Sequence, residues 1–305
     1  MSIRQLWVQK YRPATLDEYV FKDDTLKSQV KCWISDGSFP HLLMSGKPGT
    51  GKTSLARLLC AEMNLNNYDI LEINASNKNG VEVIRDTVID FAQRIPFGAF
   101  KVIILNEAHR LSPSAQSILL DVLEEYMDVT RFIFTTNYPN KFIPPLLSRL
   151  QPIQFDKMDK TEYTAKAATI LLNEGINFDI NTLDTFVTAY YPDLRKCINN
   201  LELNSRSGTL IVPDVNDSAS DYMVEAVELF KSKKFREGRK LICKHANQEE
   251  IQDLFRWLYD NVEIFGNEDL QEKAILIIKQ GLVDHTLVSD PEINLAAVLV
   301  GLSYL

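Results

Sequence analysis

Short apolar segments alternate with amphipathic segments through the first half of the chain. Leu42–Met44 is continuously apolar, and Ser54–Met63 after it has the residue spacing of a helix. Continuous apolar runs of this length are typical of strands that are buried on both faces of a parallel sheet. Because helical segments separate the runs, the pattern predicts an α/β fold, a parallel sheet with helices on both faces. The further strands are expected at 69–73, 101–105, 131–136 and 152–155.

Only helical patterns follow after Asp159. The stretch 205–220 divides them, because its serine, glycine, proline, aspartate and asparagine content is typical of a boundary. The helices are expected from 159, at 181–190, after 192, and at 222–230, 249–262, 269–279 and 292–302. The chain is therefore predicted to have an α/β domain at 1–156 and two helical domains at 157–212 and 213–305.

The segment between the first strand and the helix that follows it carries a phosphate-binding motif. Residues 46–53 read Gly-Lys-Pro-Gly-Thr-Gly-Lys-Thr, a Walker A loop in its usual setting. Its glycines allow backbone N–H groups to turn toward a polyphosphate, and the helix adds its own free N–H groups. Lys52 is expected to bridge the β- and γ-phosphates of ATP, and Thr53 to bind Mg²⁺. The expected nucleotide contacts are Gly46, Pro48, Gly49, Thr50, Gly51, Lys52, Thr53 and Ser54.

An aromatic and basic segment precedes this loop. Tyr11 and Pro13 are candidates to pack near the base of the nucleotide, and Arg12 between them is a candidate phosphate contact. A packed N-terminal arm explains the same residues. The segment alone does not decide between these two interpretations.

Composition narrows the class of protein. Hydrophobic residues make up 45% of the chain and charged residues 24%, which is ordinary for a globular protein. No apolar run reaches the roughly 20 residues of a membrane span, and the first residues do not form a signal peptide. We therefore expect no membrane partner and a cytoplasmic location (host cytoplasm if viral, nucleus if eukaryotic). The four cysteines are scattered along the chain, so we expect them to be reduced thiols. The net charge of −8 argues against a generic nucleic-acid coat and leaves a local basic patch as the means of contacting DNA.

Polar residues follow the later strands, at the sheet edge where parallel sheets bind ligands. Glu107 is the candidate to activate the water that attacks the γ-phosphate, and Asn137 is a candidate to orient that water. Asn106 occupies a position where an aspartate usually supports Mg²⁺. Its amide accepts a hydrogen bond from a metal-bound water but carries no charge. Arg149 suits a neighbouring subunit's nucleotide, and Arg195 suits the chain's own triphosphate.

Several short motifs follow one another along the first two-thirds of the chain. They are Trp7–Pro13, Gly46–Thr53, Asn74–Ser76, Glu107–His109, Leu111–Gln116, Thr136–Asn137, Ser148–Arg149 and Pro192–Lys196. In this order they resemble the AAA+ ATPase subunits of sliding-clamp loaders, both the replication factor C small subunits and the T4-like phage loader ATPase. The C-terminal helices match only as an all-helical block. The resemblance implies a lid domain at 157–212 and an oligomerising collar at 213–305.

The resemblance also implies partners. Together with other subunits, the chain would form a ring or spiral, a pentamer with several copies of it in the phage type, that opens a sliding clamp and places it on primer–template DNA. ATP would bind between subunits, with Arg149 acting in trans on the neighbour's ATP. The positions that track DNA in the family correspond to Ser76, Lys78 and Arg85, whose hydroxyl and basic groups suit phosphate contacts. A solvated helix face is the alternative explanation of Arg85.

The stretch 88–97 is apolar for the entrance of a loop, and the family contacts its clamp in this region. Phe91, Ile95 and Phe97 are therefore candidate clamp contacts. Core packing explains at least one of the three more simply.

The neutral Asn106 leaves two functions open. The chain is either a working ATPase subunit stimulated by DNA and clamp, or a structural subunit that binds ATP without hydrolysis and donates an arginine to a neighbour. Glu107, Asn137 and Arg195 favour the working ATPase, because a passive scaffold needs none of them. Another AAA+ machine, such as a branch-migration motor or helicase loader, fits the phosphate loop but fits the other motifs less well.

Overall fold

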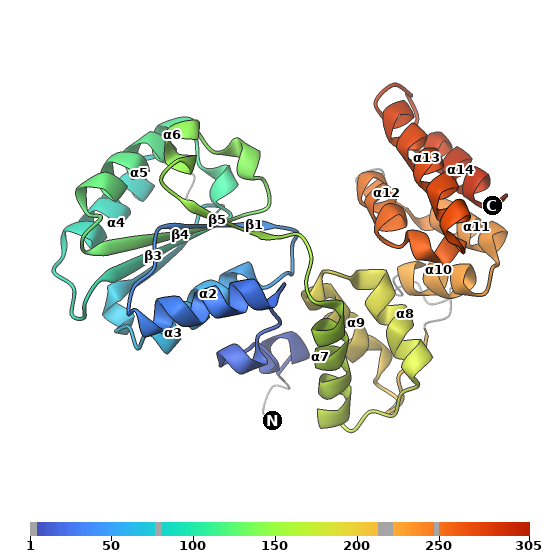
Figure 1. Ribbon diagram of the computed structural model, residues 1–305, viewed down its shortest axis with the longest axis horizontal. Helices are drawn as coiled ribbons and strands as arrows, with labels where there is room; N and C mark the ends of the chain where they lie inside the picture. Colours follow the sequence, from blue (N-terminus) through green and yellow to red (C-terminus); the bar gives the residue numbers. More distant parts are fainter. Residues whose placement is uncertain (1–4, 77–80, 213–221, 247–249) are drawn as a thin grey trace. The chain divides into compact units, whose positions relative to one another are not determined.

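The computed structural model describes residues 5–76, 81–212, 222–246 and 250–305. The chain forms two compact units (Figure 1). The first unit comprises Met1–Ile170 and Tyr191–Asn199, and the second comprises Leu171–Tyr190 and Asn200–Leu305. Helices between 160 and 204 contribute to both units, so the division into three domains stays a prediction.

The first unit is built on a five-stranded parallel sheet. Its strands are β1 Leu42–Gly46, β2 Ile70–Asn74, β3 Lys101–Asn106, β4 Thr130–Thr136 and β5 Gln151–Phe155. Their order in the sheet is β2-β3-β4-β1-β5, and all neighbours are parallel. The three central strands are almost completely buried, as expected for strands covered on both faces. The predicted parallel sheet is confirmed.

Helices cover both faces of this sheet (Figure 1). The helices of the first unit are α1 Trp7–Lys10, α2 Asp24–Ser35, α3 Lys52–Glu62, α4 Val81–Gln93, α5 Pro113–Glu125, α6 Pro144–Leu147 and the first parts of α7 Lys160–Asn173 and α9 Leu194–Asn204. Because successive strand residues point to opposite faces, Leu42 and Met44 pack in a core with α2 and α3, whereas Leu43 packs in a core with α4 and α5. Short 3-10 helices occur at Leu16–Glu18, Asn67–Asp69, Ala108–Arg110, Pro139–Lys141 and, in the second unit, Val262–Phe265.

The carboxyl ends of the central strands gather polar residues at one edge of the sheet. β1 runs directly into the phosphate loop, and β2 and β3 end in register at Asn74 and Asn106. β4 ends at Thr136, next to Asn137. The sheet therefore brings together residues that are far apart in sequence, at the edge where such sheets bind ligands.

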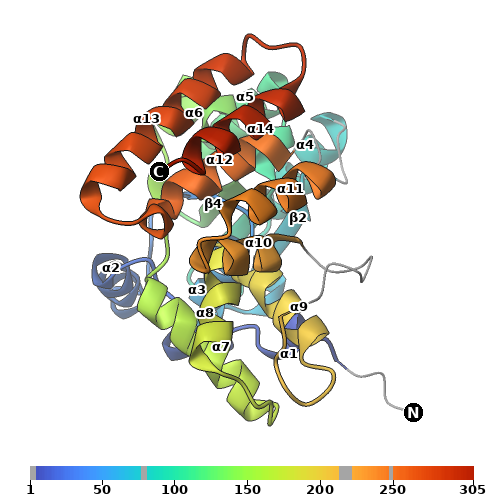
Figure 2. The ribbon, with the colours of Figure 1, turned by 90° about the vertical axis from the view of Figure 1, so that its right-hand side faces the viewer.

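The second unit is helical. Its helices are α8 Ile180–Tyr190, α10 Tyr222–Lys231, α11 Phe235–His245, α12 Ile251–Asp260, α13 Glu268–His285, α14 Pro291–Leu302 and the remainder of α7 and α9. Nε1 of Trp257 on α12 donates a hydrogen bond to the backbone oxygen of Thr188 on α8 (2.9 Å). Figure 2 shows α13 beside α14. Gly281 permits this close packing, because a Cβ there would lie 2.2 Å from Cγ2 of Val298. Among the helices of the described residues, none has the length and apolar character needed to cross a membrane.

Candidate nucleotide site

The phosphate loop joins β1 to the N-terminus of α3. Gly46, Gly49 and Gly51 have positive φ angles of 143°, 71° and 86°. A Cβ on Gly46 would lie 2.6 Å from the backbone oxygen of Phe155, and one on Gly49 would lie 1.7 Å from Oδ1 of Asp193. Glycine is therefore required by backbone angle and by close contact. The predicted loop therefore has the glycine backbone angles that are typical of a phosphate-binding loop.

Lys52 turns its ammonium group back into the loop. Nζ donates hydrogen bonds to the backbone oxygens of Gly46 (2.8 Å) and Lys47 (2.6 Å). Burial lowers the pKa of Lys52 to about 8, although the nearby Glu107 carboxylate favours the charged form. A polyphosphate in the loop would stabilise the ammonium form, because an opposite charge at short range raises the pKa of a lysine.

Asn106 is the centre of a hydrogen-bond network at the ends of β2, β3 and β4. Its Oδ1 accepts hydrogen bonds from the hydroxyls of Thr53 (2.9 Å) and Thr135 (3.0 Å), and its Nδ2 donates to Oε1 of Glu72 (2.6 Å). Arg57 on α3 donates to both oxygens of this carboxylate, from Nε at 2.8 Å and Nη2 at 2.6 Å. Burial acts to raise the pKa of Glu72, but the hydrogen bonds from Arg57 and Asn106 outweigh it and hold that pKa below its ordinary value.

The oxygens in this network suit a hard cation. Oγ1 of Thr53 and Oδ1 of Asn106 lie 2.9 Å apart, and oxygen is the ligand that Mg²⁺ prefers. In the part of the chain that the structure describes, no group of three or more His, Cys, Asp or Glu side chains is arranged to hold a metal. Magnesium at this site would therefore need oxygens from nucleotide phosphates and water as well.

Glu107 and Asn137 line the same cavity. Glu107 has a left-handed backbone (φ 54°, ψ 37°), which is uncommon for a residue with a side chain and often marks a functional position. Its Oε2 lies 3.5 Å from Nε2 of His109. Burial lowers the pKa of His109, so a neutral imidazole lies beside the Glu107 carboxylate at pH 7.

Positive side chains converge on this cavity. Lys52, Arg12, Arg57 and Arg195 all line it. Burial is the main cause of a lowered pKa at Arg12, and the positive charges of Arg57 and Arg195 lower it further, so the three guanidinium groups lie within electrostatic range of one another. A polyphosphate would relieve their mutual repulsion.

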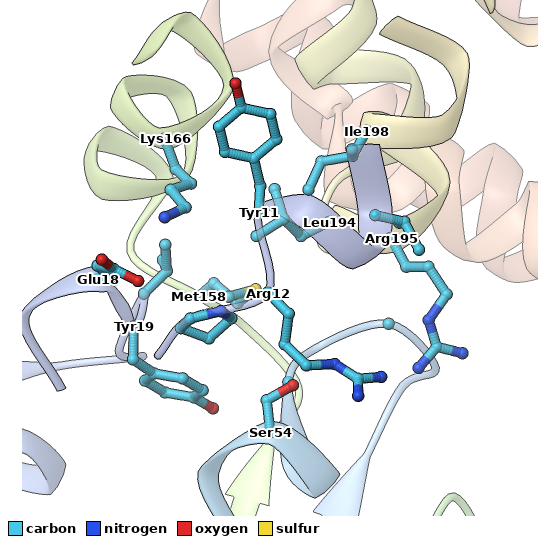
Figure 3. A pocket seen from close by; sticks show the side chains of 15 residues that line it. Tyr11, Arg12, Glu18, Tyr19, Ser54, Met158, Lys166, Leu194, Arg195 and Ile198 are labelled. Carbon is cyan, nitrogen blue, oxygen red and sulfur yellow. The ribbon is translucent and has the colours of Figure 1, made fainter. Parts of the chain in front are cut away.

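A second pocket, shown in Figure 3, shares Arg12, Gly49, Gly51, Ser54 and Arg195 with the phosphate cavity. Tyr11, Arg12, Pro13 and Arg195, all predicted from the sequence, line it. Most of the remaining lining residues are apolar or glycine: Val8, Tyr19, Val20, Gly49, Gly51, Met158, Leu194 and Ile198. The polar ones are Glu18, Ser54 and Lys166. An apolar pocket beside an anion-binding loop suits the base of a nucleotide.

The structure also adds residues that sequence reasoning missed. Glu72, Arg57 and Thr135 belong to the Asn106 network. Tyr19 lines the second pocket, and its buried hydroxyl has no hydrogen-bond partner among the described residues. One signal was available: Arg57 follows Thr53 by four residues and therefore shares its helix face.

Arg149 lies elsewhere on the first unit. It is exposed, forms an ion pair with Glu124 and donates a hydrogen bond from Nη1 to the backbone oxygen of Pro145 (2.8 Å). The described residues that line the phosphate cavity do not include it. Its predicted role at a neighbouring subunit's nucleotide stays a prediction.

The candidate DNA residues lie at and beyond the end of β2. Ser76 is half-buried, and its N–H donates to Oδ1 of Asn74 (3.0 Å). Arg85 is exposed on α4. Lys78 lies outside the described residues. Their role with DNA stays a prediction.

The three candidate clamp residues separate in the structure. Ile95 and Phe97 are 88% and 75% exposed, whereas Phe91 is only 7% exposed. Phe91 belongs to the core beneath α4 and α5, where Lys101 Nζ lies 5.7 Å from its ring centre. Phe91 is therefore corrected from a surface contact to a core residue, because its ring completes the packing of α4 on the sheet.

Comparison with known proteins identifies the family of this chain. The profile of the "ATPase family associated with various cellular activities (AAA)" matches residues 42–157. A replication factor C small subunit of Methanococcus vannielii is 33% identical over 316 residues, covering 98% of each chain. The corresponding protein of Sulfurisphaera tokodaii is also 33% identical, covering 99% of this chain and 97% of its own. A replication factor C small subunit 2 of Pyrobaculum islandicum is 37% identical over 213 residues, covering 68% of this chain and 66% of its own.

Solved structures agree at the level of fold. The RuvB Holliday junction branch migration motor of Thermotoga maritima superimposes with a TM-score of 0.54 at 17% identity, covering 76% of this chain and 79% of its own. A single-residue variant of the same RuvB gives a TM-score of 0.56, also at 17% identity, with the same coverage. At this identity the likeness shows the fold alone.

Proposed function

The chain belongs to the family of replication factor C small subunits, and from this premise we propose how its nucleotide site serves a sliding-clamp loader. It is an AAA ATPase of the clamp-loader type. The alternative function, a structural subunit that binds ATP without hydrolysing it, is not favoured. In the proposal, binding of ATP with Mg²⁺ assembles the state that opens the clamp. Hydrolysis on primer–template DNA then releases the clamp. A subunit with this role acts where the DNA is located, which is the cytoplasm in a cell without a nucleus.

The observation that carries this proposal is the shared cavity of the phosphate loop, Asn106 and Glu107. Lys52 would exchange its loop carbonyls for the β- and γ-phosphates, and the Thr53 and Asn106 oxygens would hold Mg²⁺, directly or through water. Bound Mg²⁺ supplies positive charge against the phosphates. Glu107 would accept a proton from the attacking water, with Asn137 orienting that water.

Arg149 is proposed to act on a neighbour's ATP. Its guanidinium is exposed and held at the surface by Glu124 and Pro145. An arginine supplied in trans stabilises charge that develops on the γ-phosphate during transfer. Several copies of the chain, or this chain with other loader subunits, would then form the complete sites.

The proposed clamp surface consists of Tyr68, Ile95 and Phe97. All three side chains are largely exposed, and the rings of Tyr68 and Phe97 lie 5.6 Å apart. The buried Asp69 carboxylate accepts hydrogen bonds from the N–H groups of Phe97 (2.9 Å) and Gly98 (2.8 Å), which fixes the loop that presents Ile95 and Phe97. A preformed apolar surface loses little conformational entropy on binding and is typical of a protein contact.

The end of α4, which leads into this loop, is also fixed. Nζ of Lys101 is buried beneath the end of α4 and donates hydrogen bonds to the backbone oxygens of Phe91 (3.0 Å), Ala92 (2.6 Å) and Arg94. A cation at this position satisfies carbonyls that the helix end leaves without partners. Both ends of the surface loop are therefore held by buried charges.

Clamp binding tests the proposed surface. The double variant Ile95→Ala/Phe97→Ala should reduce ATP-dependent clamp affinity of the assembled loader by at least about tenfold, because each truncation removes a large exposed apolar contact. Affinity for a fluorescent ATP analogue should not change. Leu172→Ala, which truncates a side chain that is 67% exposed outside this surface, is the matched control. Equal clamp affinity for the double variant and the control would reject this surface.

A further inference from the structure

Glu72 stands beside the proposed metal site without a part in the mechanism described above. Its carboxylate is held from one side by Arg57 and from the other by the Asn106 amide. We propose that Glu72 is a positioning residue, which fixes the Asn106 amide with its oxygen toward Thr53 and supplies the negative charge that Asn106 lacks. This inference rests on the proposed Mg²⁺–ATP function of the cavity.

The orientation of the Asn106 amide follows from its neighbours. The ionised carboxylate of Glu72 can only accept hydrogen bonds, so the group 2.6 Å from it must be the Asn106 NH₂. In the opposite orientation two oxygens would meet at that distance. The Oδ1 atom therefore faces the hydroxyls of Thr53 and Thr135.

The strand pairing places Glu72 where it can act. β2 and β3 pair with Asn74 opposite Asn106 and Glu72 opposite Ile104, so Glu72 lies two residues before the end of β2. Residues two apart in a strand share a face. Glu72 is therefore on the same face as Asn74, toward the helix that carries Thr53 and Arg57.

Arg57 explains how a carboxylate is retained in this position. Its two hydrogen bonds use both carboxylate oxygens, and such paired geometry holds the group in one orientation. Residues that orient metal ligands typically change metal affinity about 10–100-fold when they are replaced. We therefore expect Glu72 to affect metal binding more than nucleotide binding.

The arrangement also predicts how position 106 should respond to an aspartate. With Glu72 unchanged, Asn106→Asp would place two carboxylates at the distance now spanned by a hydrogen bond, and like charges repel. In Glu72→Gln/Asn106→Asp the amide and the carboxylate exchange positions. The amide NH₂ at position 72 can then donate to the carboxylate at position 106, and an oxygen again faces Thr53.

The experiment measures Mn²⁺ binding by electron paramagnetic resonance, using the assembled protein saturated with a non-hydrolysable ATP analogue. Glu72→Gln should weaken Mn²⁺ binding about tenfold, whereas affinity for the analogue without metal should stay within about twofold. Glu72→Gln/Asn106→Asp should restore Mn²⁺ affinity to within about threefold of the original chain. Glu62→Gln, which neutralises a carboxylate at the far end of α3 that accepts a hydrogen bond from Leu16 N–H, is the charge control.

Two results would overturn the inference: unchanged Mn²⁺ affinity in Glu72→Gln, or a double variant that binds Mn²⁺ no better than Glu72→Gln. Asn106→Asp alone is measured beside them, because an aspartate at position 106 is itself a metal ligand. The inference predicts that this single variant binds Mn²⁺ no better than the original chain, since Glu72 repels the new carboxylate. Recovery in the double variant without a gain in Asn106→Asp alone supports the inference even if Glu72→Gln lowers the melting temperature. Failure of the original chain to bind the ATP analogue at all would instead reject the proposed function.

Discussion

Asn106 and Glu107 lie side by side at the end of β3 but are held very differently. Three hydrogen bonds fix the Asn106 amide. Glu107 has a left-handed backbone, and its carboxylate oxygen Oε2 lies 3.5 Å from Nε2 of His109. A fixed amide suits a metal shell, whereas a carboxylate with so long a contact can turn toward a water. The two residues therefore suit different tasks in one reaction.

Glu107→Gln separates these tasks. We expect steady-state ATP turnover to fall about 10²- to 10⁴-fold, because the amide cannot accept the proton of the attacking water. Affinity for a fluorescent ATP analogue should stay within about twofold, since the phosphate loop and Asn106 are unchanged. Turnover that survives the substitution would show that Glu107 is not the base.

The sequence identified the candidate residues of the motifs but not the residues that hold Asn106 in place. Lys52, Thr53 and Glu107 belong to contiguous motifs whose residue types specify their chemistry. Glu72 and Arg57 reach Asn106 only through the pairing of β2 with β3 and the packing of α3. Such contacts depend on tertiary structure, and no local pattern in the sequence contains them.

At the scale of elements, the strands agreed with the apolar pattern to within a residue or two. Helices α2 and α11 were not predicted from the sequence. In α2 the buried Leu26, Val30 and Trp33 are separated by polar residues, and the cap by Asp23, whose Oδ1 accepts from Leu26 N–H at 2.7 Å, was the available signal. Helix α13 was predicted only at 269–279, whereas it extends to His285. Its length depends on packing against other helices of the second unit, which the sequence does not reveal.

His41 links three strands at the start of β1. Its Nδ1 accepts a hydrogen bond from Phe132 N–H (3.1 Å), and its backbone oxygen accepts from Gln151 N–H (2.8 Å). Burial, assisted by the charge of Arg131, lowers the pKa of His41 to about 4 from an ordinary 6.5. Protonation of Nδ1 would remove the acceptor that Phe132 uses.

This pKa shift predicts acid sensitivity. The unfolded chain binds a proton at His41 below pH 6.5 and the folded chain only near pH 4, so the free energy of unfolding should fall as pH falls through that window. The contribution is on the order of 1–2 kcal/mol after allowance for solvent screening. His41→Asn keeps an acceptor that does not titrate and should flatten this part of the profile in urea unfolding. His245→Asn, at an exposed histidine, is the control, and identical profiles for His41→Asn and the original chain would contradict the assignment.

At the scale of the whole molecule, the candidate nucleotide site and Arg149 lie apart from each other. The cavity contains Glu107, whereas Arg149 is exposed beside Glu124. A head-to-tail contact between copies would bring Arg149 of one to the cavity of the next. Arg149 was expected from the sequence to serve a neighbouring subunit, and this role stays a prediction. The sequence could not define the compact units, because α7 and α9 contribute to both.

Mixed assemblies test the trans arrangement. Glu107→Gln and Arg149→Ala chains should each be nearly inactive alone, since an arginine in trans contributes about 10³- to 10⁵-fold to turnover. An equal mixture should recover up to about a quarter of the original turnover, because that fraction of random head-to-tail contacts pairs an intact Glu107 with an intact Arg149. The double variant Glu107→Gln/Arg149→Ala cannot complement either chain and is the control. No recovery in the mixture would mean that both residues act within one chain.

The most direct measurement is steady-state ATP hydrolysis by the reconstituted loader, with and without clamp and primer–template DNA. The proposed function predicts low basal turnover, strong stimulation when clamp and DNA are present together, and loss of that stimulation in both Glu107→Gln and Arg149→Ala. Such a result would also show that Asn106 permits hydrolysis at this chain's own site. Turnover that neither clamp nor DNA stimulates would contradict the proposed clamp-loading function.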